Sequence, residues 1–242
     1  MGYRFTGSPR WQARRMTEVS ARIDYDGDGI EESTLPPAPW SAITSWLADA
    51  RQRQADCGDV PEPDALALAT IDETGQPHVR TVLMRYLETD GPGFYTNLES
   101  RKGLDLQASS AVAASLTWQA MYRAIRFVGR AEPLPPEVVE PYFASRPWGS
   151  RISAWTSLQS QPVASRDELE TTYATYAARW PDDGKPDDVP VPPFWGGYRI
   201  VCEEVELWGG RKNRLHDRLV YVRAAAGGLD AAASWRIERR QP

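Results

Sequence analysis

Residues Ala65 to Asn97 read ALALATIDETGQPHVRTVLMRYLETDGPGFYTN. Runs of strand length alternate here with short segments of Asp, Gly and Pro, which favour tight turns. The strand-like runs are Ala65–Ile71, Val79–Leu87 and Phe94–Asn97, and the turns are Asp72–Gly75 and Asp90–Gly93. Turns of hairpin size between successive strands predict antiparallel pairing.

Further strand-like segments occur after this region, and helical segments lie before and between them. The strands are Val112–Trp118, Ala124–Glu132, Tyr198–Trp208, Leu219–Arg223 and Ser234–Glu238, and the helices are Trp40–Gln54, a short one after Ser100, Pro135–Ala144 and Ser165 to about Trp180. The segment Pro181–Pro193 is too rich in Pro and Asp for either element. The pattern predicts one α+β domain over residues 22–242, with an antiparallel sheet curled toward a barrel and peripheral helices.

The composition of the 242 residues is that of an ordinary globular protein, with 41% hydrophobic and 25% charged residues. A net charge of −5 provides no general field for nucleic acid or an anionic membrane, and no apolar run approaches the ~20 residues of a membrane helix. Two cysteines without a Cys-x-x-Cys pair argue against structural zinc and fit the cytoplasm.

Residues 1–21 are expected to be a disordered arm, or to follow a start codon placed too far upstream, with Met16 as the alternative start.

The segment from Asn97 to Gly103 places Arg101 and Lys102 at the start of a helix that follows a strand. Free N–H groups and the helix dipole favour an anion there, so the segment predicts a phosphate site. Arg80 and Arg85, near the two ends of the preceding strand, would add guanidinium donors. The alternative is a set of solvated cations beside a charged strand edge.

Two other patterns carry titratable residues. In Arg214-Leu-His-Asp-Arg218, arginine neighbours lower the pKa of His216 and Asp217 raises it, which predicts proton exchange near neutrality; the alternative is a surface loop with incidental charges. Asp24-x-Asp-x-Asp-Gly29 imitates the start of a calcium loop, but Leu35 replaces the Glu of its twelfth position, which favours an acidic turn over a metal site. With no nucleophile beside a base, chemistry by a bound cofactor is favoured.

Together, these segments resemble the pyridoxine (pyridoxamine) 5′-phosphate oxidase family. The matching stretches are Arg80-Thr-Val-Leu-Met-Arg85, Phe94-Tyr-Thr-Asn-Leu-Glu-Ser-Arg-Lys102, Tyr142-Phe-Ala-Ser-Arg-Pro147, Ala154-Trp-Thr-Ser-Leu-Gln-Ser-Gln161, Phe194-Trp-Gly-Gly-Tyr-Arg199 and Asn213-Arg-Leu-His-Asp-Arg218. They stand in family order and span about Arg22 to the C-terminus. The resemblance implies a split β-barrel homodimer that holds an FMN in each of two clefts between the subunits.

The resemblance also implies the residues of the cofactor site. The FMN phosphate would meet Arg80, Arg101 and Lys102, the anion site that the charge pattern predicts. Tyr95 and Thr96 would line the flavin. Four residues would complete the site, with the first three expected across the subunit interface: Gln159, Ser160, Trp208 and Arg218.

The implied reaction converts pyridoxine or pyridoxamine 5′-phosphate to pyridoxal 5′-phosphate, with dioxygen as acceptor and H2O2 as product. The phosphate of this phosphorylated pyridine would be held by Arg85, Tyr142, Arg146 and Ser150. Arg214 and His216 match the catalytic pair beside the pyridine ring. Arg22 and Tyr25 align with a mobile segment that closes over the substrate.

The chain departs from the family pattern at three positions. Arg85 stands in place of a Lys, Ala124 in place of a flavin-contacting Gln, and Trp148 in place of an Arg near the substrate phosphate. The last departure leaves two alternatives open: an FMN oxidase of the same fold that acts on another aromatic such as a phenazine precursor, and a non-catalytic protein that binds flavin or pyridoxal phosphate.

Overall fold

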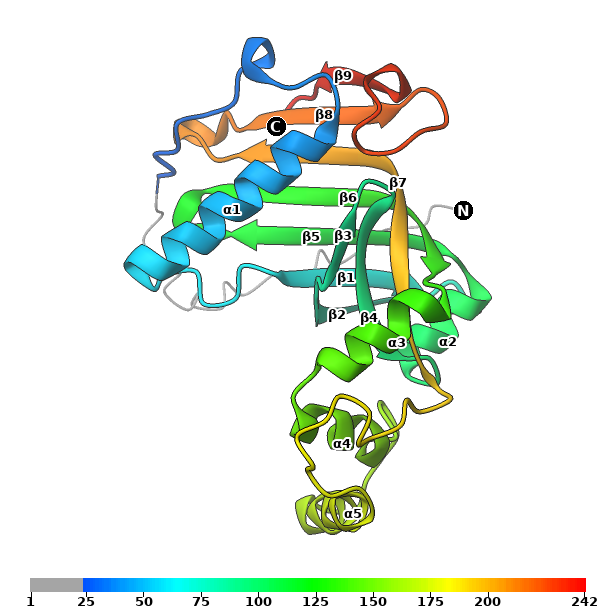
Figure 1. Ribbon diagram of the computed structural model, residues 1–242. Helices are drawn as coiled ribbons and strands as arrows, with labels where there is room; N and C mark the ends of the chain where they lie inside the picture. Colours follow the sequence, from blue (N-terminus) through cyan, green and yellow to red (C-terminus); the bar gives the residue numbers. More distant parts are fainter. Residues whose placement is uncertain (1–23) are drawn as a thin grey trace, which may run out of the picture.

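The computed structural model describes residues 24–242. At its centre is a nine-stranded antiparallel sheet in the order β2-β1-β5-β6-β7-β4-β3, extended by β8 on β7 and by β9 on β8 (Figure 1). The strands are β1 (Ala65–Ile71), β2 (Pro77–Leu83), β3 (Tyr86–Glu88), β4 (Gly91–Asn97), β5 (Ala111–Trp118), β6 (Arg123–Pro133), β7 (Trp195–Gly209), β8 (Asp217–Arg223) and β9 (Trp235–Arg239). In Figure 1, β4 and the first half of β7 cross the direction of β1, β5 and β6, which gives the curled sheet of a split barrel.

The predicted first hairpin is confirmed, since β1 pairs with β2 from Ala65↔Leu83 to Ile71↔Pro77. The predicted single strand from Val79 to Leu87 is wrong, because β2 ends at Leu83 and β3 begins at Tyr86. At the break, the Met84 N–H donates to Asp64 O (2.9 Å) and the Arg85 N–H donates to Gly93 O (3.1 Å). The chain changes partner strand at this point, from β1 to β4.

The predicted helices are all present, and one unpredicted helix joins them. The helices are α1 (Pro39–Cys57), α2 (Arg101–Ala108), α3 (Pro136–Ser145), α4 (Trp148–Thr156) and α5 (Arg166–Arg179). Ser165 caps α5, with the Glu168 N–H donating to Ser165 Oγ at 3.1 Å and the Ala164 N–H donating to the Glu168 carboxylate at 3.2 Å. The unpredicted helix is α4. Its N-cap residue is Pro147, which makes no side-chain cap, so the usual sequence signal for the start of a helix is missing.

Two hydrophobic clusters hold the molecule together. In the larger one, α1 lies across the sheet and buries Ile43 and Leu47 among strand residues such as Leu116 and Phe127. The smaller cluster centres on Phe143 and joins α3, α4 and the segment between α5 and β7.

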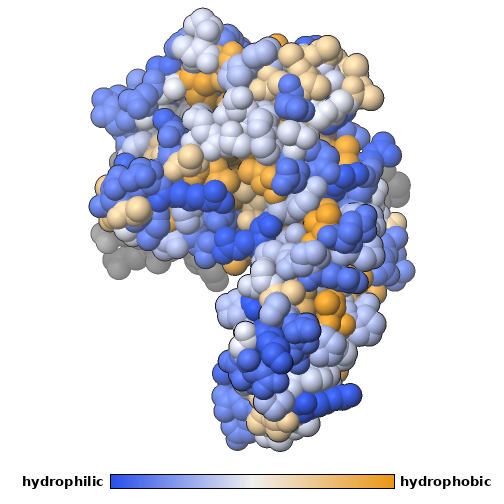
Figure 2. Space-filling view, in the orientation of Figure 1, coloured by the Kyte–Doolittle hydropathy of each residue, from blue (hydrophilic) through white to orange (hydrophobic). Residues whose placement is uncertain are grey.

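Helices α3 to α5 extend away from the sheet, with α5 at the far end (Figure 1). No residue of α5 is buried, and Figure 2 shows this end as mainly hydrophilic, with apolar patches nearer the sheet and α1. Arg151 of α4 and Asp188, in the segment between α5 and β7, form a buried ion pair of 2.7 Å that links this segment to α4. No helix among residues 24–242 is long and apolar enough to cross a membrane.

Candidate functional site

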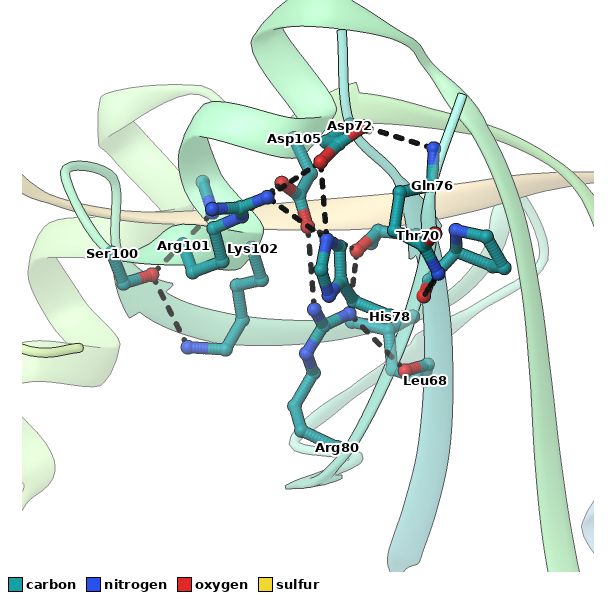
Figure 3. Close-up of polar contacts among 12 residues, drawn as sticks. Leu68, Thr70, Asp72, Gln76, His78, Arg80, Ser100, Arg101, Lys102 and Asp105 are labelled. Carbon is teal, nitrogen blue, oxygen red and sulfur yellow. Dashed lines mark hydrogen bonds and ion pairs between the residues drawn. The ribbon is translucent and has the colours of Figure 1, made fainter. Parts of the chain in front are cut away.

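The three cations predicted to bind an anion gather where β2 meets the start of α2 (Figure 3). Ser100 caps α2 and accepts a hydrogen bond from the Gly103 N–H, so Arg101 and Lys102 occupy the first turn. A Cβ at position 103 would lie 2.1 Å from Leu98 O, which explains the glycine. The predicted arrangement, a strand followed by a helix with Arg101 and Lys102 at its start, is therefore confirmed, and the Ser100 cap is an addition to it.

Lys102 is the most deeply buried of these cations, with 8% of its surface exposed. Its ammonium donates to Gln159 Oε1 (2.5 Å), Thr96 Oγ1 (3.1 Å) and Ser100 Oγ (3.2 Å). Burial, aided by the positive charge of Arg80, lowers the pKa of Lys102 to about 8. Among the described residues only neutral oxygens accept hydrogen bonds from this ammonium, so a bound anion would stabilise its charge.

The guanidinium groups of Arg80 and Arg101 are each fixed by hydrogen bonds to neighbouring residues. Arg80 Nη1 donates to Thr70 Oγ1 (2.6 Å) and Leu68 O (3.3 Å), and its Nη2 donates to Asp105 (3.3 Å). Arg101 Nε donates to Asp105 at 3.0 Å, and its Nη2 donates to Asp72 at 2.6 Å. Arg80 Nε and Arg101 Nη1 have no partner among residues 24–242, so both side chains keep donors for a ligand.

Gln159 does not need a second chain to reach this cluster. Its Oε1 accepts from Lys102 of its own chain, whereas we expected Gln159, Ser160 and Trp208 across an interface. The reason is the turn after α4, where Ser160 adopts φ 74° and the chain folds back over β4. Ser160 itself is exposed in this turn.

A second set of predicted residues lies at the junction of α3 and α4. Tyr142 lies in α3, Arg146 ends α3, and Ser150 is in the first turn of α4. The Tyr142 ring stacks on Tyr95 with centroids 3.7 Å apart and planes at 7°. The stack joins α3 to β4, the strand that also carries Thr96 of the cation cluster.

Arg146 is the one residue of this set with an unusual environment. Its guanidinium carbon lies 4.3 Å from the Trp195 ring centroid, and its Nη1 is buried without a hydrogen-bond partner among the described residues. Burial lowers its pKa. The stack over Trp195 compensates part of the lost hydration.

Arg85 was expected to bind the substrate phosphate together with Tyr142, Arg146 and Ser150, but it does not lie with them. Its guanidinium donates to Asp64 at 2.9 Å and pairs with Glu62 at 3.6 Å. The hydrogen bond from the Met84 N–H to Asp64 O brings Arg85 to that loop. Its polar contacts are therefore with the α1–β1 loop and not with Tyr142, Arg146 or Ser150.

Trp148 was expected to approach the substrate phosphate. Its Nε1 instead donates to Trp180 O at 2.9 Å, and its ring meets Tyr173 edge-on at 6.4 Å. The indole fills the space between α4 and α5, so the departure at this position is explained by packing of the helical extension.

A third set, the ring cluster, forms at the other end of β7 around Trp208. The His216 ring lies 4.8 Å from Trp208, and Tyr25 lies 5.4 Å from His216 and 6.1 Å from Trp208. The Arg211 N–H donates to His216 Nδ1 at 3.1 Å, which places the proton of the neutral ring on Nε2. Burial and Arg214 lower the pKa of His216, against the opposing effect of Asp217.

Other predicted residues surround the ring cluster. Arg218 pairs with Glu206 at 2.7 Å, and Ala124, which stands at the family's Gln position, is opposite Trp208 across β6 and β7. Arg214 is exposed at φ 62° in the loop between β7 and β8. Arg22 lies outside the described residues.

Comparison with known proteins decides the family. Residues 57–179 match the family described as pyridoxamine 5′-phosphate oxidase, and residues 195–242 match the pyridoxine 5′-phosphate oxidase C-terminal dimerisation region. The chain belongs to the pyridoxamine 5′-phosphate oxidase family.

Relatives match almost the whole chain. The pyridoxine/pyridoxamine 5′-phosphate oxidase of Kineococcus radiotolerans is 45% identical over 222 residues, 91% of this chain and 97% of that protein. The enzyme of the same name from Streptomyces avermitilis is 42% identical over 224 residues, 93% and 96% of the two chains. The structure of PhzG from Burkholderia lata, solved with tetrahydrophenazine-1-carboxylic acid, matches with a TM-score of 0.77 at 27% identity, covering 89% of this chain and 99% of PhzG.

In this oxidase-family member, sequence reasoning missed the residues behind the cation cluster: Thr70, Asp72, His78 and Asp105. Thr70 is a polar residue inside an apolar strand, and Asp105 follows Arg101 by four positions, the spacing of a helical ion pair. These two signals could have identified them. His78, a residue of β2, has its Nε2 2.9 Å from Arg101 Nη2 and 3.3 Å from the Asp72 carboxylate.

Proposed function

We propose that this protein binds FMN and oxidises pyridoxine or pyridoxamine 5′-phosphate to pyridoxal 5′-phosphate, with dioxygen as acceptor and H2O2 as product. Arg146 carries the substrate assignment. Its Nη1 is buried and has no hydrogen-bond partner among the described residues, which is costly unless a ligand supplies a negative charge. A phosphate monoester beside Tyr142 and Ser150 would supply that charge as a dianion, whereas an uncharged aromatic would supply none.

The cation cluster fits the phosphate of FMN. Lys102 offers a buried ammonium, and Arg80 and Arg101 each offer donors without a partner among the described residues. Charge-assisted hydrogen bonds to a dianionic phosphate contribute about 1.5–3 kcal/mol each, which makes the phosphate the main anchor. Bound FMN would supply the redox chemistry, two-electron oxidation of the substrate carbon followed by reoxidation with dioxygen.

The remaining residues would position the substrate. His216, with its proton on Nε2, would donate a hydrogen bond to the ring or to its oxygen substituent. Exposed Arg214 would add positive charge beside it. Tyr25, which stacks on Tyr122 with centroids 5.0 Å apart, would cover the site. These residues bind and orient the substrate, and orientation over the cofactor accounts for much of such catalysis.

We also propose that the site is completed by a second copy of the chain. Thr96, beside the cation cluster, pairs with Gly196 at one end of β7, and Trp208 lies near the other end. At ~3.3 Å per residue, about 40 Å of curved strand separates the two. One flavin would take its phosphate contacts from one protomer and its ring contacts from Trp208 and Arg218 of the other, which agrees with the match to a dimerisation region.

A second candidate is an FMN oxidase of a phenazine precursor, which the likeness to PhzG favours. The Trp148 departure no longer supports it, because Trp148 packs against Trp180 and Tyr173. The unpartnered Nη1 of Arg146 favours an anionic substrate, and the hydroxyls of Tyr142 and Ser150 in the same set favour a phosphate over a single carboxylate.

The test is peroxide release by the purified, FMN-loaded protein. We expect turnover of pyridoxine or pyridoxamine 5′-phosphate and none of the unphosphorylated vitamers. Turnover of a dihydrophenazine carboxylic acid alone would establish the second candidate. Flavin binding without peroxide from any of these compounds would show a non-catalytic binding protein. Sedimentation of the flavin-loaded protein as a 27.1 kDa monomer at micromolar concentration would contradict the shared site.

A further inference from the structure

Asp105 lies between the two arginines of the cation cluster. It is 2% exposed, in the second turn of α2. Its Oδ1 accepts from Arg101 Nε at 3.0 Å, and its Oδ2 accepts from Arg80 Nη2 at 3.3 Å and from Thr70 Oγ1 at 2.6 Å. Figure 3 shows one carboxylate joined to side chains from β1, β2 and α2.

This arrangement places a negative charge beside a site that we assign to a dianionic phosphate. Considered as a charge alone, Asp105 opposes phosphate binding. Considered as an acceptor, it holds together two guanidiniums that repel each other and that come from different elements. These two effects have opposite signs, so they can be separated by experiment.

The bonds to Asp105 leave a defined set of donors. They use Arg101 Nε and Arg80 Nη2, while Thr70 and Leu68 use Arg80 Nη1 and Asp72 uses Arg101 Nη2. Each guanidinium is thus fixed on one side, and Arg80 Nε and Arg101 Nη1 remain without partners among residues 24–242. Long side chains fixed before binding lose less conformational entropy when a ligand arrives.

We propose that Asp105, supported by Thr70, is a positioning residue that orients Arg80 and Arg101 toward the phosphate of the flavin and sets the preference for FMN over riboflavin. The proposal rests on the proposed function, since it requires that the cation cluster receives the FMN phosphate. The substitution Asp105→Asn keeps the shape and removes the one charge that the two arginines share, while the pair of Arg101 with Asp72 stays in place. Glu99→Gln is the matched control, because Glu99 is exposed near the start of α2 and its carboxylate contacts neither arginine.

The experiment measures the dissociation constants of FMN and riboflavin for the apoprotein by quenching of flavin fluorescence. For Asp105→Asn we expect FMN binding to weaken at least tenfold while riboflavin binding changes less than twofold. Glu99→Gln should leave FMN binding unchanged or slightly stronger. Thr70→Val, which removes the supporting hydroxyl at nearly constant volume, should weaken FMN binding in the same direction and keeps the test available if Asp105→Asn fails to fold.

Unchanged or tighter FMN binding by Asp105→Asn would overturn the proposal, because charge would then be the only role of Asp105. Equal losses for FMN and riboflavin would also overturn it, since a general disturbance of the fold affects both ligands. A wild-type protein that binds riboflavin as tightly as FMN would instead contradict the phosphate assignment in the proposed function.

Discussion

The ammonium of Lys102 lies 2.5 Å from Gln159 Oε1, and its other two acceptors are the hydroxyls of Thr96 and Ser100. None of these three acceptors carries a charge. Burial therefore acts on the lysine without a counterion, Arg80 adds repulsion, and the pKa falls to about 8. A bound phosphate would supply the missing negative charge.

FMN binding should consequently become proton-linked above pH 8. The free protein loses the Lys102 proton as the pH rises through about 8, whereas the phosphate complex holds it, so binding takes up a proton. The dissociation constant of FMN should rise by up to about tenfold per pH unit between pH 8 and 10. Fluorescence titrations measure it, and Lys102→Met should remove the dependence. An identical slope in Lys102→Met would assign the proton to another group.

Removing two of the cluster's cations should give a colourless protein. Arg101→Ala combined with Lys102→Ala deletes two charge-assisted hydrogen bonds to the phosphate. At about 1.5–3 kcal/mol each, the loss raises the dissociation constant of FMN by roughly 10²- to 10⁴-fold. The absorbance ratio of flavin to protein after purification measures occupancy. Arg130→Ala, which removes an exposed arginine paired with Glu203, is the control and should stay yellow. Stoichiometric flavin in the double variant would show that the phosphate binds elsewhere.

Features set by neighbouring residues were predictable from the sequence. The hairpin Ala65–Leu83, the Ser100 cap and the cations beside it depend on turn and helix-end chemistry over a few positions. Features set by distant contacts were not predictable. Gln159 reaches Lys102 across 57 positions, and the direction of Trp148 depends on a carbonyl 32 positions away.

The Trp148→Arg substitution shows how a distant contact changes what the sequence pattern leads one to expect. It restores the residue that the family pattern has there, and it would raise activity toward pyridoxine 5′-phosphate if Trp148 only impaired the family reaction. In the structure it removes a hydrogen bond to Trp180 O and packing against Tyr173. We expect a loss of about 1–3 kcal/mol in the free energy of unfolding and no gain in kcat/KM. Urea denaturation and peroxide assays measure both. Wild-type stability with faster turnover would place this side chain in the substrate site.

Alanine substitution of two arginines near the junction of α3 and α4 should affect different properties: stability for Arg151 and activity for Arg146. Arg151 forms a buried pair with Asp188, so Arg151→Ala leaves a buried carboxylate unpaired and should cost about 3–5 kcal/mol of stability. Arg146 has no carboxylate partner among the described residues. Arg146→Ala should therefore change stability by only about 1 kcal/mol, because the lost stack on Trp195 is offset by removal of a buried, unpartnered nitrogen. It should lower kcat/KM for the phosphorylated substrate by roughly 10- to 100-fold, the value of one charged hydrogen bond, and leave FMN bound. Thermal unfolding and steady-state kinetics of the two variants, each with its flavin content, measure the contrast. Unchanged kcat/KM in Arg146→Ala would show that the substrate phosphate is held by other residues.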